Sequence, residues 1–172
     1  AIVYIDGPIM MGRSEPSPFG GSPAGSTTVR AALEKALADE NVKAVVLRVD
    51  SPGGSAVASD IMYIAATQLK KVKPVIVSMG SVAGSGGYYV SLPGDVVFAE
   101  ETTITGSIGV VGGKLTWKKL WEEKIGINTT EYNRGKRAGI FSMNAKWSDE
   151  DRSFMMNYLN EVYTQFKGRV TE

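Results

Sequence analysis

Two successive strand–turn–helix units constrain the fold of this chain more than any other feature. Residues 43–49 are an apolar run typical of a buried strand. They end in the turn Asp50-Ser-Pro-Gly-Gly-Ser55, and a helical pattern follows. Residues 75–79 are a second apolar run, which ends in the glycine-rich segment 80–87 and again leads into helix-like sequence. Strands that alternate with helices in this way predict a parallel sheet with right-handed crossovers.

The remaining sequence extends this pattern. Residues 1–5 and 95–99 indicate further buried strands. Ser148, with Asp151 three residues later, predicts the start of a final helix that carries one apolar stripe, which we expect to lie in the core or between subunits. Residues 7–26 are mostly Gly, Pro and Ser, so we expect a flexible loop there.

Shorter segments complete the predicted fold. Thr27 or Thr28 can cap a helix, residues 116–124 indicate a short helix, and residues 127–132 indicate a strand. A chain of 172 residues is long enough to bury one hydrophobic core. We therefore expect residues 1–172 to form a single α/β domain, in which a mainly parallel sheet is flanked by helices.

Composition excludes several classes of protein. Apolar residues make up 43% of the chain and charged residues 22%, a balance typical of a soluble globular protein. The net charge of +1 gives no basic excess, so we expect no nucleic-acid partner. No apolar run approaches the ~20 residues that span a bilayer. The sequence opens at Ala1 without Met, and we interpret it as a fragment of a longer, membrane-anchored chain.

The absence of two residue types restricts the chemistry further. The chain has no Cys, which excludes disulfides, thiol nucleophiles and thiolate metal sites. It has no His, which excludes a Ser-His-Asp triad and a His-ligated zinc site. If the chain is a hydrolase, its general base must be a lysine or a carboxylate.

The two glycine-rich turns are the candidate site. Both follow parallel strands at their carboxyl ends, where α/β proteins place their sites, and both can present backbone N–H groups to an anion or an oxyanion. A phosphate site fits less well, because Gly109-Val-Val-Gly-Gly-Lys114 misses the P-loop spacing by one residue. Two plain tight turns would give the same pattern.

Ser85 is the best candidate nucleophile, because it lies between two glycines after a strand and before a helix, as in a nucleophile elbow. A lysine base must be neutral, so its pKa must fall from ~10.4 to near 7 by burial among apolar groups. Lys136 precedes the apolar residues 138–141 and is the best candidate, although Arg134 and Arg137 beside it also suit a plain basic loop.

Several stretches together resemble a known family. They are Ala1-Ile-Val-Tyr-Ile-Asp-Gly-Pro-Ile9, Leu47-Arg-Val-Asp-Ser-Pro-Gly-Gly-Ser55, Val82-Ala-Gly-Ser-Gly-Gly-Tyr-Tyr89 and Thr103-Ile-Thr-Gly-Ser-Ile-Gly109. In order and spacing they resemble the signal peptide peptidase A family of serine peptidases. The resemblance implies a ClpP/crotonase-type fold of repeated β-β-α units and a Ser/Lys dyad.

The resemblance also implies roles for individual side chains. Ser85 matches the nucleophile, and Ser107 matches a serine that helps to hold the lysine. Lys136 lies 51 residues beyond Ser85, where short members of the family carry their lysine. Gly135 stands where the family often has an aromatic residue or His, so Lys146 is kept as the second candidate.

Backbone groups and partners follow from the same resemblance. Gly53 and Gly54, with Gly86, match the residues whose N–H groups stabilise the oxyanion, and no metal or cofactor is implied. The expected substrates are apolar peptides such as released signal peptides. We expect a homo-oligomer in which the dyad is shared between protomers. We also expect membrane association on the extracytoplasmic face of a prokaryotic cell, through a segment outside a chain that is itself soluble.

Three alternatives stay open at this level. A crotonase-like acyl-CoA enzyme would share the fold and the oxyanion turn, but it would need no serine at position 85. A non-catalytic scaffold repeat of a larger protease would tolerate Ser85→Ala. A membrane-organising binding protein of the stomatin-partner type would also fit, since some of these are related to the proteases.

Overall fold

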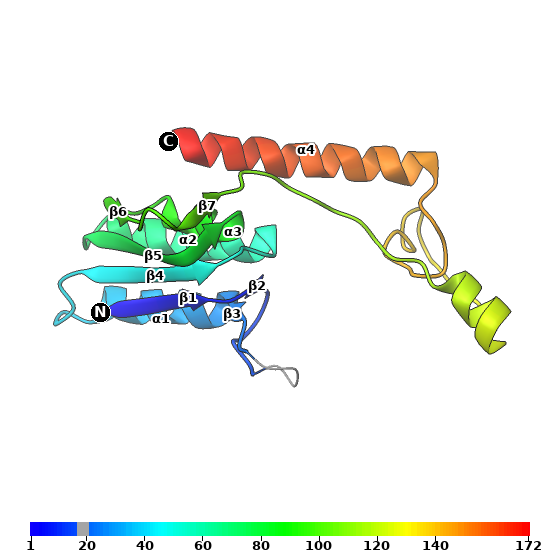
Figure 1. Cartoon of the computed structure of the whole chain (residues 1–172), viewed down its shortest axis with the longest axis horizontal. Helices are drawn as coiled ribbons and strands as arrows, with labels where there is room; N and C mark the ends of the chain where they lie inside the picture. The colour runs from blue at the N-terminus through cyan, green and yellow to red at the C-terminus, as the bar shows by residue number, and fades with distance from the viewer. Residues whose placement is uncertain (17–20) are drawn as a thin grey trace. The chain divides into compact units, whose positions relative to one another are not determined.

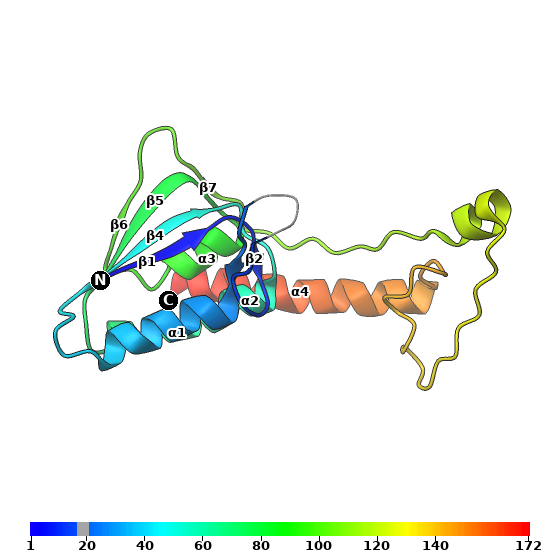
Figure 2. The ribbon, with the colours of Figure 1, turned by 90° about the horizontal axis from the view of Figure 1, so that it is seen from below.

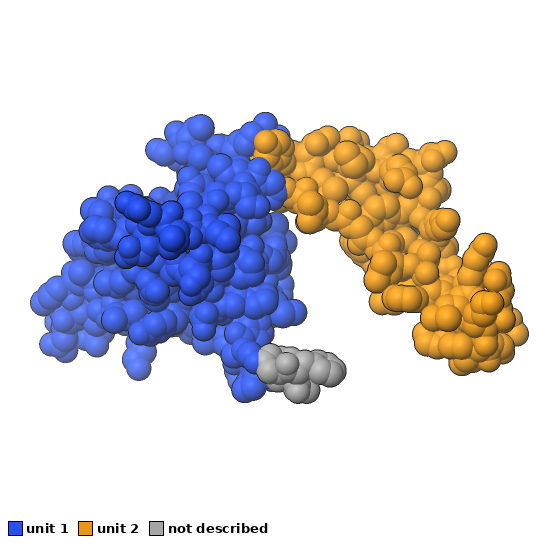
Figure 3. Space-filling model, in the orientation of Figure 1, with its two compact units in different colours: residues 1–109, 164–172 blue, residues 110–163 orange. Residues whose placement is uncertain are grey.

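The computed structural model describes residues 1–16 and 21–172 and divides the chain into two compact units. Unit 1 comprises residues 1–109 and 164–172, and unit 2 comprises residues 110–163; Figure 3 colours them separately. The candidate serine and both glycine-rich turns belong to unit 1, whereas both candidate lysines belong to unit 2.

A parallel sheet forms the centre of unit 1, in the strand order β1-β4-β5-β6 (Figure 1). The strands are β1 (Ile2–Asp6), β4 (Val45–Ser51), β5 (Val75–Gly84) and β6 (Val96–Phe98), and every pair is parallel. A short strand, β7 (Ile104–Gly106), pairs with the last residues of β5. The predicted parallel sheet is therefore confirmed.

Helices cover one face of this sheet (Figure 2). They are α1 (Ser26–Ala38), α2 (Ala56–Lys70) and the short α3 (Gly86–Ser91), and the last residues of α4 (Asp149–Thr171) also belong to unit 1. Side chains of β4 alternate between buried and half-buried because successive residues of a strand face opposite sides of a sheet. The strands that the sequence predicted at residues 43–49 and 75–79 thus turn one face toward the helices.

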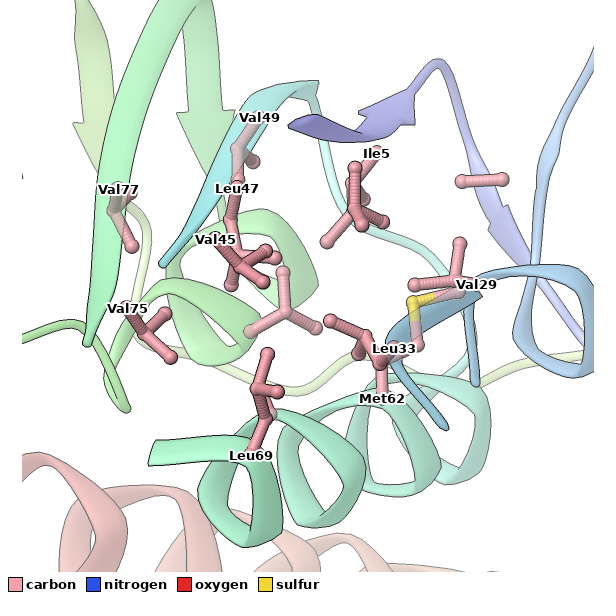
Figure 4. Close-up of a cluster of buried hydrophobic side chains, with 14 of the residues drawn as sticks. Ile5, Val29, Leu33, Val45, Leu47, Val49, Met62, Leu69, Val75 and Val77 are labelled. Atoms are coloured by element: carbon pink, nitrogen blue, oxygen red, sulfur yellow. The ribbon is translucent and has the colours of Figure 1, made fainter. Parts of the chain in front are cut away.

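The core of unit 1 lies between this sheet and α1 and α2. Figure 4 shows Val45 and Leu47 of β4 directed toward the helices that carry Leu33 and Met62. These four side chains are at most 1% exposed. Burial of one such side chain stabilises a fold by about 1.5–3 kcal/mol, so the core holds the strand ends in fixed positions.

The segment expected to be a flexible loop has ordered ends. Strands β2 (Ile9–Met10) and β3 (Ala24–Gly25) pair in parallel, and the N–H of Ile9 donates to Gly53 O at 2.9 Å. Its central residues 17–20 lie outside the described residues. Helix α1 begins after Gly25, so the prediction that Thr27 or Thr28 caps it was wrong; the hydroxyl of Thr28 instead accepts the N–H of Ser14 at 2.9 Å.

Unit 2 contains little regular structure before α4. A π-helix (η1, Leu120–Ile125) overlaps the second half of the predicted short helix and extends one residue past its end. The predicted strand at residues 127–132 was wrong: the structure describes all of unit 2 and places no strand there, since no neighbouring strand supplies backbone partners. Ser148 and Asp151 form the predicted cap of α4 through reciprocal hydrogen bonds of 2.8–3.2 Å.

The described part of the chain holds no helix that combines the length and apolar character needed to cross a bilayer.

Candidate active site

Ser85 lies at the junction of β5 and α3 in a strained backbone conformation. Its φ is 49° and its ψ is −115°. Within residues 1–16 and 21–172, Ser85 and Ser107, with a φ of 53°, are the two non-glycine residues with positive φ. Such conformations cost about 1–3 kcal/mol and persist where the surrounding structure holds them, often at functional sites. The two serines chosen from sequence motifs are thus the two strained ones.

Neighbouring strands and helices hold this junction in place. The N–H of Ser85 donates to Gly106 O at 2.8 Å, and the N–H of Tyr89 donates to Ser85 O at 2.9 Å. A Cβ added to Gly84 would lie 3.8 Å from the Cβ of Ser107. Strand β7 therefore brings Ser107 beside the nucleophile turn.

The first glycine turn packs directly against the second. Gly53 has a φ of 92°, and a Cβ there would lie 2.5 Å from Gly86 N and 2.9 Å from the Cβ of Ser85. A Cβ on Gly86 would in turn lie 3.3 Å from Gly54 N and would overlap the hydroxyl of Ser59. Only glycine allows the two turns to approach this closely.

The backbone N–H groups of these glycines differ in their partners. The N–H of Gly53 donates to the hydroxyl of Ser51 at 3.1 Å, and that hydroxyl donates to Gly7 O at 2.7 Å. The N–H groups of Gly54 and Gly86 donate to no acceptor within the described residues. Gly54 and Gly86 therefore offer two free donors beside Ser85, whereas the donor of Gly53 is used internally.

The importance of Ser51 was not apparent from the sequence. Its side chain is fully buried, and it ties the first glycine turn to the end of β1. A Ser before Pro-Gly-Gly reads as an ordinary turn residue, so only the direction of its hydroxyl in three dimensions could have indicated this contact.

Lys136 lies in unit 2, in surroundings unlike those expected for a lysine base. Its side chain is 71% exposed, and its Nζ lies 2.6 Å from Oε1 of Glu150. The hydrogen bond from Lys136, followed by its positive charge, lowers the pKa of the Glu150 carboxyl. The apolar residues that follow Lys136 do not enclose it, since Phe141 is 69% exposed. Lys146, the second candidate, is also exposed.

The structure thus brings five of the six predicted site residues together in unit 1: Ser85, Ser107, Gly53, Gly54 and Gly86. It places the sixth, Lys136, in the other compact unit. In the part of the chain that the structure describes, no group of three or more carboxylates has the arrangement of a metal site.

A family profile and several proteins named as proteases are similar to this chain. A sequence profile of peptidase family S49 matches residues 67–172. The chain is 45% identical over 136 residues to Protease 4 of Haemophilus influenzae. The matched region covers 76% of this chain and 21% of that protein. It is 50% identical over 98 residues to the chloroplastic serine protease SPPA of Arabidopsis thaliana, covering 57% of this chain and 14% of that protein.

A third relative carries a more specific name. The chain is 35% identical over 135 residues to a putative signal peptide peptidase SppA of Enterococcus faecium, covering 78% of this chain and 39% of that protein. The chain therefore spans less than half the length of each of these relatives. The matching profile, the parallel α/β fold and the strained serine between two glycine turns agree, and the chain belongs to peptidase family S49, whose fold is of the ClpP/crotonase type.

Proposed function

We propose that this chain is the catalytic part of a serine endopeptidase that cleaves apolar peptides, such as signal peptides released in a membrane, with Ser85 as nucleophile and Lys136 as general base. One observation carries the proposal: Ser85 is held in a strained strand-to-helix turn beside two N–H groups that have no acceptor among residues 1–16 and 21–172. The names of the relatives, which include a serine protease and a signal peptide peptidase, support the class of reaction.

The reaction proceeds by acyl transfer. Neutral Lys136 takes the hydroxyl proton as Oγ of Ser85 attacks the peptide carbonyl, and the same lysine then gives this proton to the leaving amine. Water, deprotonated by the lysine, hydrolyses the resulting ester. In this scheme Ser107 hydrogen-bonds the lysine. No metal or cofactor is needed for any step.

The oxyanion receives its hydrogen bonds from Gly54 and Gly86. Two N–H donors that do not have to leave other partners stabilise a developing negative charge without reorganisation. The N–H of Gly53 already donates to Ser51, so Gly53 contributes by having no Cβ rather than by donating. This assignment refines the sequence-based one, which gave Gly53 a donor role.

The lysine and the serine come together in an oligomer. Ser85 and Lys136 belong to different compact units, and a lysine base must lose both its solvent and its carboxylate partner to become neutral. A homo-oligomer in which one protomer supplies Ser85 and its neighbour supplies Lys136 meets both requirements. Membrane association, through a segment outside this chain, would bring the assembly to its apolar substrates.

A specific contact favours a second candidate. Lys136 is 71% exposed and forms an ion pair with Glu150, a contact that a purely structural lysine would also make. A repeat whose lysine is structural would act as a scaffold within a larger protease. Peptide hydrolysis by the wild-type oligomer distinguishes the two functions.

Hydrolysis of an unstructured, apolar fluorogenic peptide tests the proposal, with the oligomer mass measured on the same samples. Ser85→Ala and Lys136→Arg both lose activity while the oligomer mass is unchanged. The first variant lacks the nucleophilic hydroxyl, and in the second an arginine keeps the charge but does not give up its proton. Lys124→Arg in η1 is the matched control and retains activity. A Lys136→Arg variant as active as the wild type rejects Lys136 as the base and points first to Lys146. An inactive wild-type oligomer supports the scaffold, and turnover of an acyl-CoA thioester instead of the peptide rejects the peptidase.

A further inference from the structure

Strand β5 contains a bulge just before the nucleophile turn. Val49 pairs with Met79, but the next pair along the two strands is Ser51 with Ala83. Strand β4 thus advances two residues while β5 advances four, and the two additional residues of β5 lie within 80–82. Bulges of this kind re-aim a strand and are over-represented next to active sites.

The bulge decides which residue of β5 reaches the first glycine turn. In an unbroken register Ser51 would pair with Ser81, and Ala83 would take the position that Ser85 has. With the bulge, the Cβ of Ser85 lies 2.9 Å from where a Cβ on Gly53 would be. The position of the nucleophile therefore depends on the two additional residues.

One carboxylate satisfies the N–H groups that the bulge removes from the sheet. Oδ1 of Asp50 accepts the N–H of Val82 at 3.1 Å, and Oδ2 accepts the N–H of Ser81 at 3.3 Å. A Cβ on Gly80 would overlap this carboxylate, so the bulge and the side chain fit closely. Without Asp50, these two N–H groups would have no acceptor within the described residues.

Other side chains satisfy the carbonyl groups of the same segment. Nη1 of Arg48 donates to Met79 O at 3.0 Å, and the hydroxyl of Thr103 donates to Gly80 O at 2.9 Å. These donors come from β4 and from the segment before β7. Hydrogen bonds thus hold the bulge from both sides: Arg48 and Thr103 bind its carbonyl groups, and Asp50 binds its N–H groups.

We propose that Asp50 is a positioning residue for the nucleophile: its carboxylate holds the β5 bulge and thereby places Ser85 beside the N–H groups of Gly54 and Gly86. This inference rests on the proposed peptidase function and adds a residue to its site. Its carboxylate accepts the N–H groups of Ser81 and Val82, so it acts through the backbone of β5.

Substitution of Asp50 tests the inference, because a misplaced nucleophile lowers kcat but leaves KM nearly unchanged. Asp50→Asn keeps the shape of the side chain but offers one acceptor oxygen in place of two, and Asp50→Ala offers none. We expect kcat to fall by about tenfold in Asp50→Asn and about 100-fold in Asp50→Ala, with KM within about threefold of the wild type, because a small misplacement of a reacting group has effects of this size. The rate at which a fluorophosphonate labels Ser85 falls in parallel.

Asp6→Ala is the matched control. Asp6 pairs with Asp50 in the register of β1 and β4, so the variant removes the same charge from the adjacent position of the same sheet. Its kcat and labelling rate stay at the wild-type level. Hydrogen exchange of the Val82 amide, followed by NMR, reports on the bulge without requiring activity, and we expect faster exchange in Asp50→Asn than in Asp6→Ala.

The possible outcomes separate the two proposals. Wild-type kcat and labelling in folded Asp50→Asn and Asp50→Ala would overturn the inference, and so would a rise in KM with unchanged kcat. If Asp50→Ala does not fold, Asp50→Asn decides. If the wild type neither hydrolyses peptide nor reacts at Ser85, the proposed function fails. Unchanged exchange of the Val82 amide in Asp50→Asn would then also reject the proposal that Asp50 holds the β5 bulge.

Discussion

At the scale of single residues, the candidate site depends on glycines, which have no side chain to keep the two turns apart. Gly53 lets the first turn lie against Gly86 and Ser85, and its φ of 92° suits glycine. The sequence predicted these positions well because close backbone approach requires glycine, and motifs record that requirement. It did not predict that Gly53 donates to Ser51, since the direction of an N–H depends on contacts that are distant in the chain.

Comparison of Gly53→Ala with Gly12→Ala separates the steric overlap of an added Cβ from the strain of a positive φ. We expect peptide hydrolysis to be lost and the free energy of unfolding to fall by about 4 kcal/mol or more, because a Cβ meets backbone atoms that cannot move aside. Gly12→Ala is the control: Gly12 has a φ of 93° but nothing within 4 Å of an added Cβ. Urea unfolding of both variants checks this, and equal losses would show that strain alone explains the effect.

At the scale of elements, the sequence predicted the main strands and helices of unit 1, but it predicted neither β2 and β3 nor the surroundings of α4. The apolar stripe of this helix was expected to lie in the core or between subunits, yet only two of its residues, Met155 and Phe166, are buried within the described chain. Phe166 packs edge-on against Tyr89 of α3, with ring centroids 5.0 Å apart. Periodicity identifies an apolar face but does not say which part of it meets a partner.

Phe166→Ala should release the end of α4 from unit 1. The side chain is 5% exposed, and removal of a buried phenylalanine costs about 3–5 kcal/mol. Phe154→Ala in the same helix removes a ring that is 45% exposed, so we expect a loss below about 1 kcal/mol. Guanidinium unfolding measures both. A loss for Phe166→Ala no larger than that for Phe154→Ala would contradict the packing described here.

Tyr89, which packs against Phe166, leads us to expect a loss of stability at alkaline pH. Burial, followed by the hydrogen bond from the Tyr89 hydroxyl to Asp60, raises the pKa of Tyr89 from 10.0 to about 12. Because the pKa is higher in the folded state, this stabilisation is complete below pH 10 and is lost as the pH rises toward 12. Urea unfolding between these pH values checks it. Tyr89→Phe should flatten the decline, and an unchanged slope would contradict the assignment.

At the scale of the whole molecule, the chain separates its predicted dyad between two compact units. The strand–turn–helix pattern pointed to Ser85 because its three parts follow one another directly, and the family resemblance pointed to Ser107. The surroundings of Lys136 could not be predicted in this way, since desolvation depends on residues that are remote in the chain or belong to another protomer. In this chain the lysine is exposed and paired with Glu150.

A mixing experiment tests whether protomers share the dyad. Ser85→Ala and Lys136→Arg are each inactive alone, but after dissociation and joint reassembly about one quarter of the sites contain an intact serine and an intact lysine from adjacent protomers. We expect peptide hydrolysis to return to about a quarter of the wild-type rate. No recovery, with the oligomer mass restored, would place both residues of each dyad in one protomer.

The most direct test of the central claim is covalent labelling of the wild-type chain by a fluorophosphonate, with the modified peptide identified by mass spectrometry. The account predicts that the label is on Oγ of Ser85, that Lys136→Arg reduces the labelling rate by at least about 100-fold, and that Lys124→Arg leaves it unchanged. A label on another serine would contradict the assignment of the nucleophile. Undiminished labelling of Ser85 in Lys136→Arg would contradict the assignment of the base.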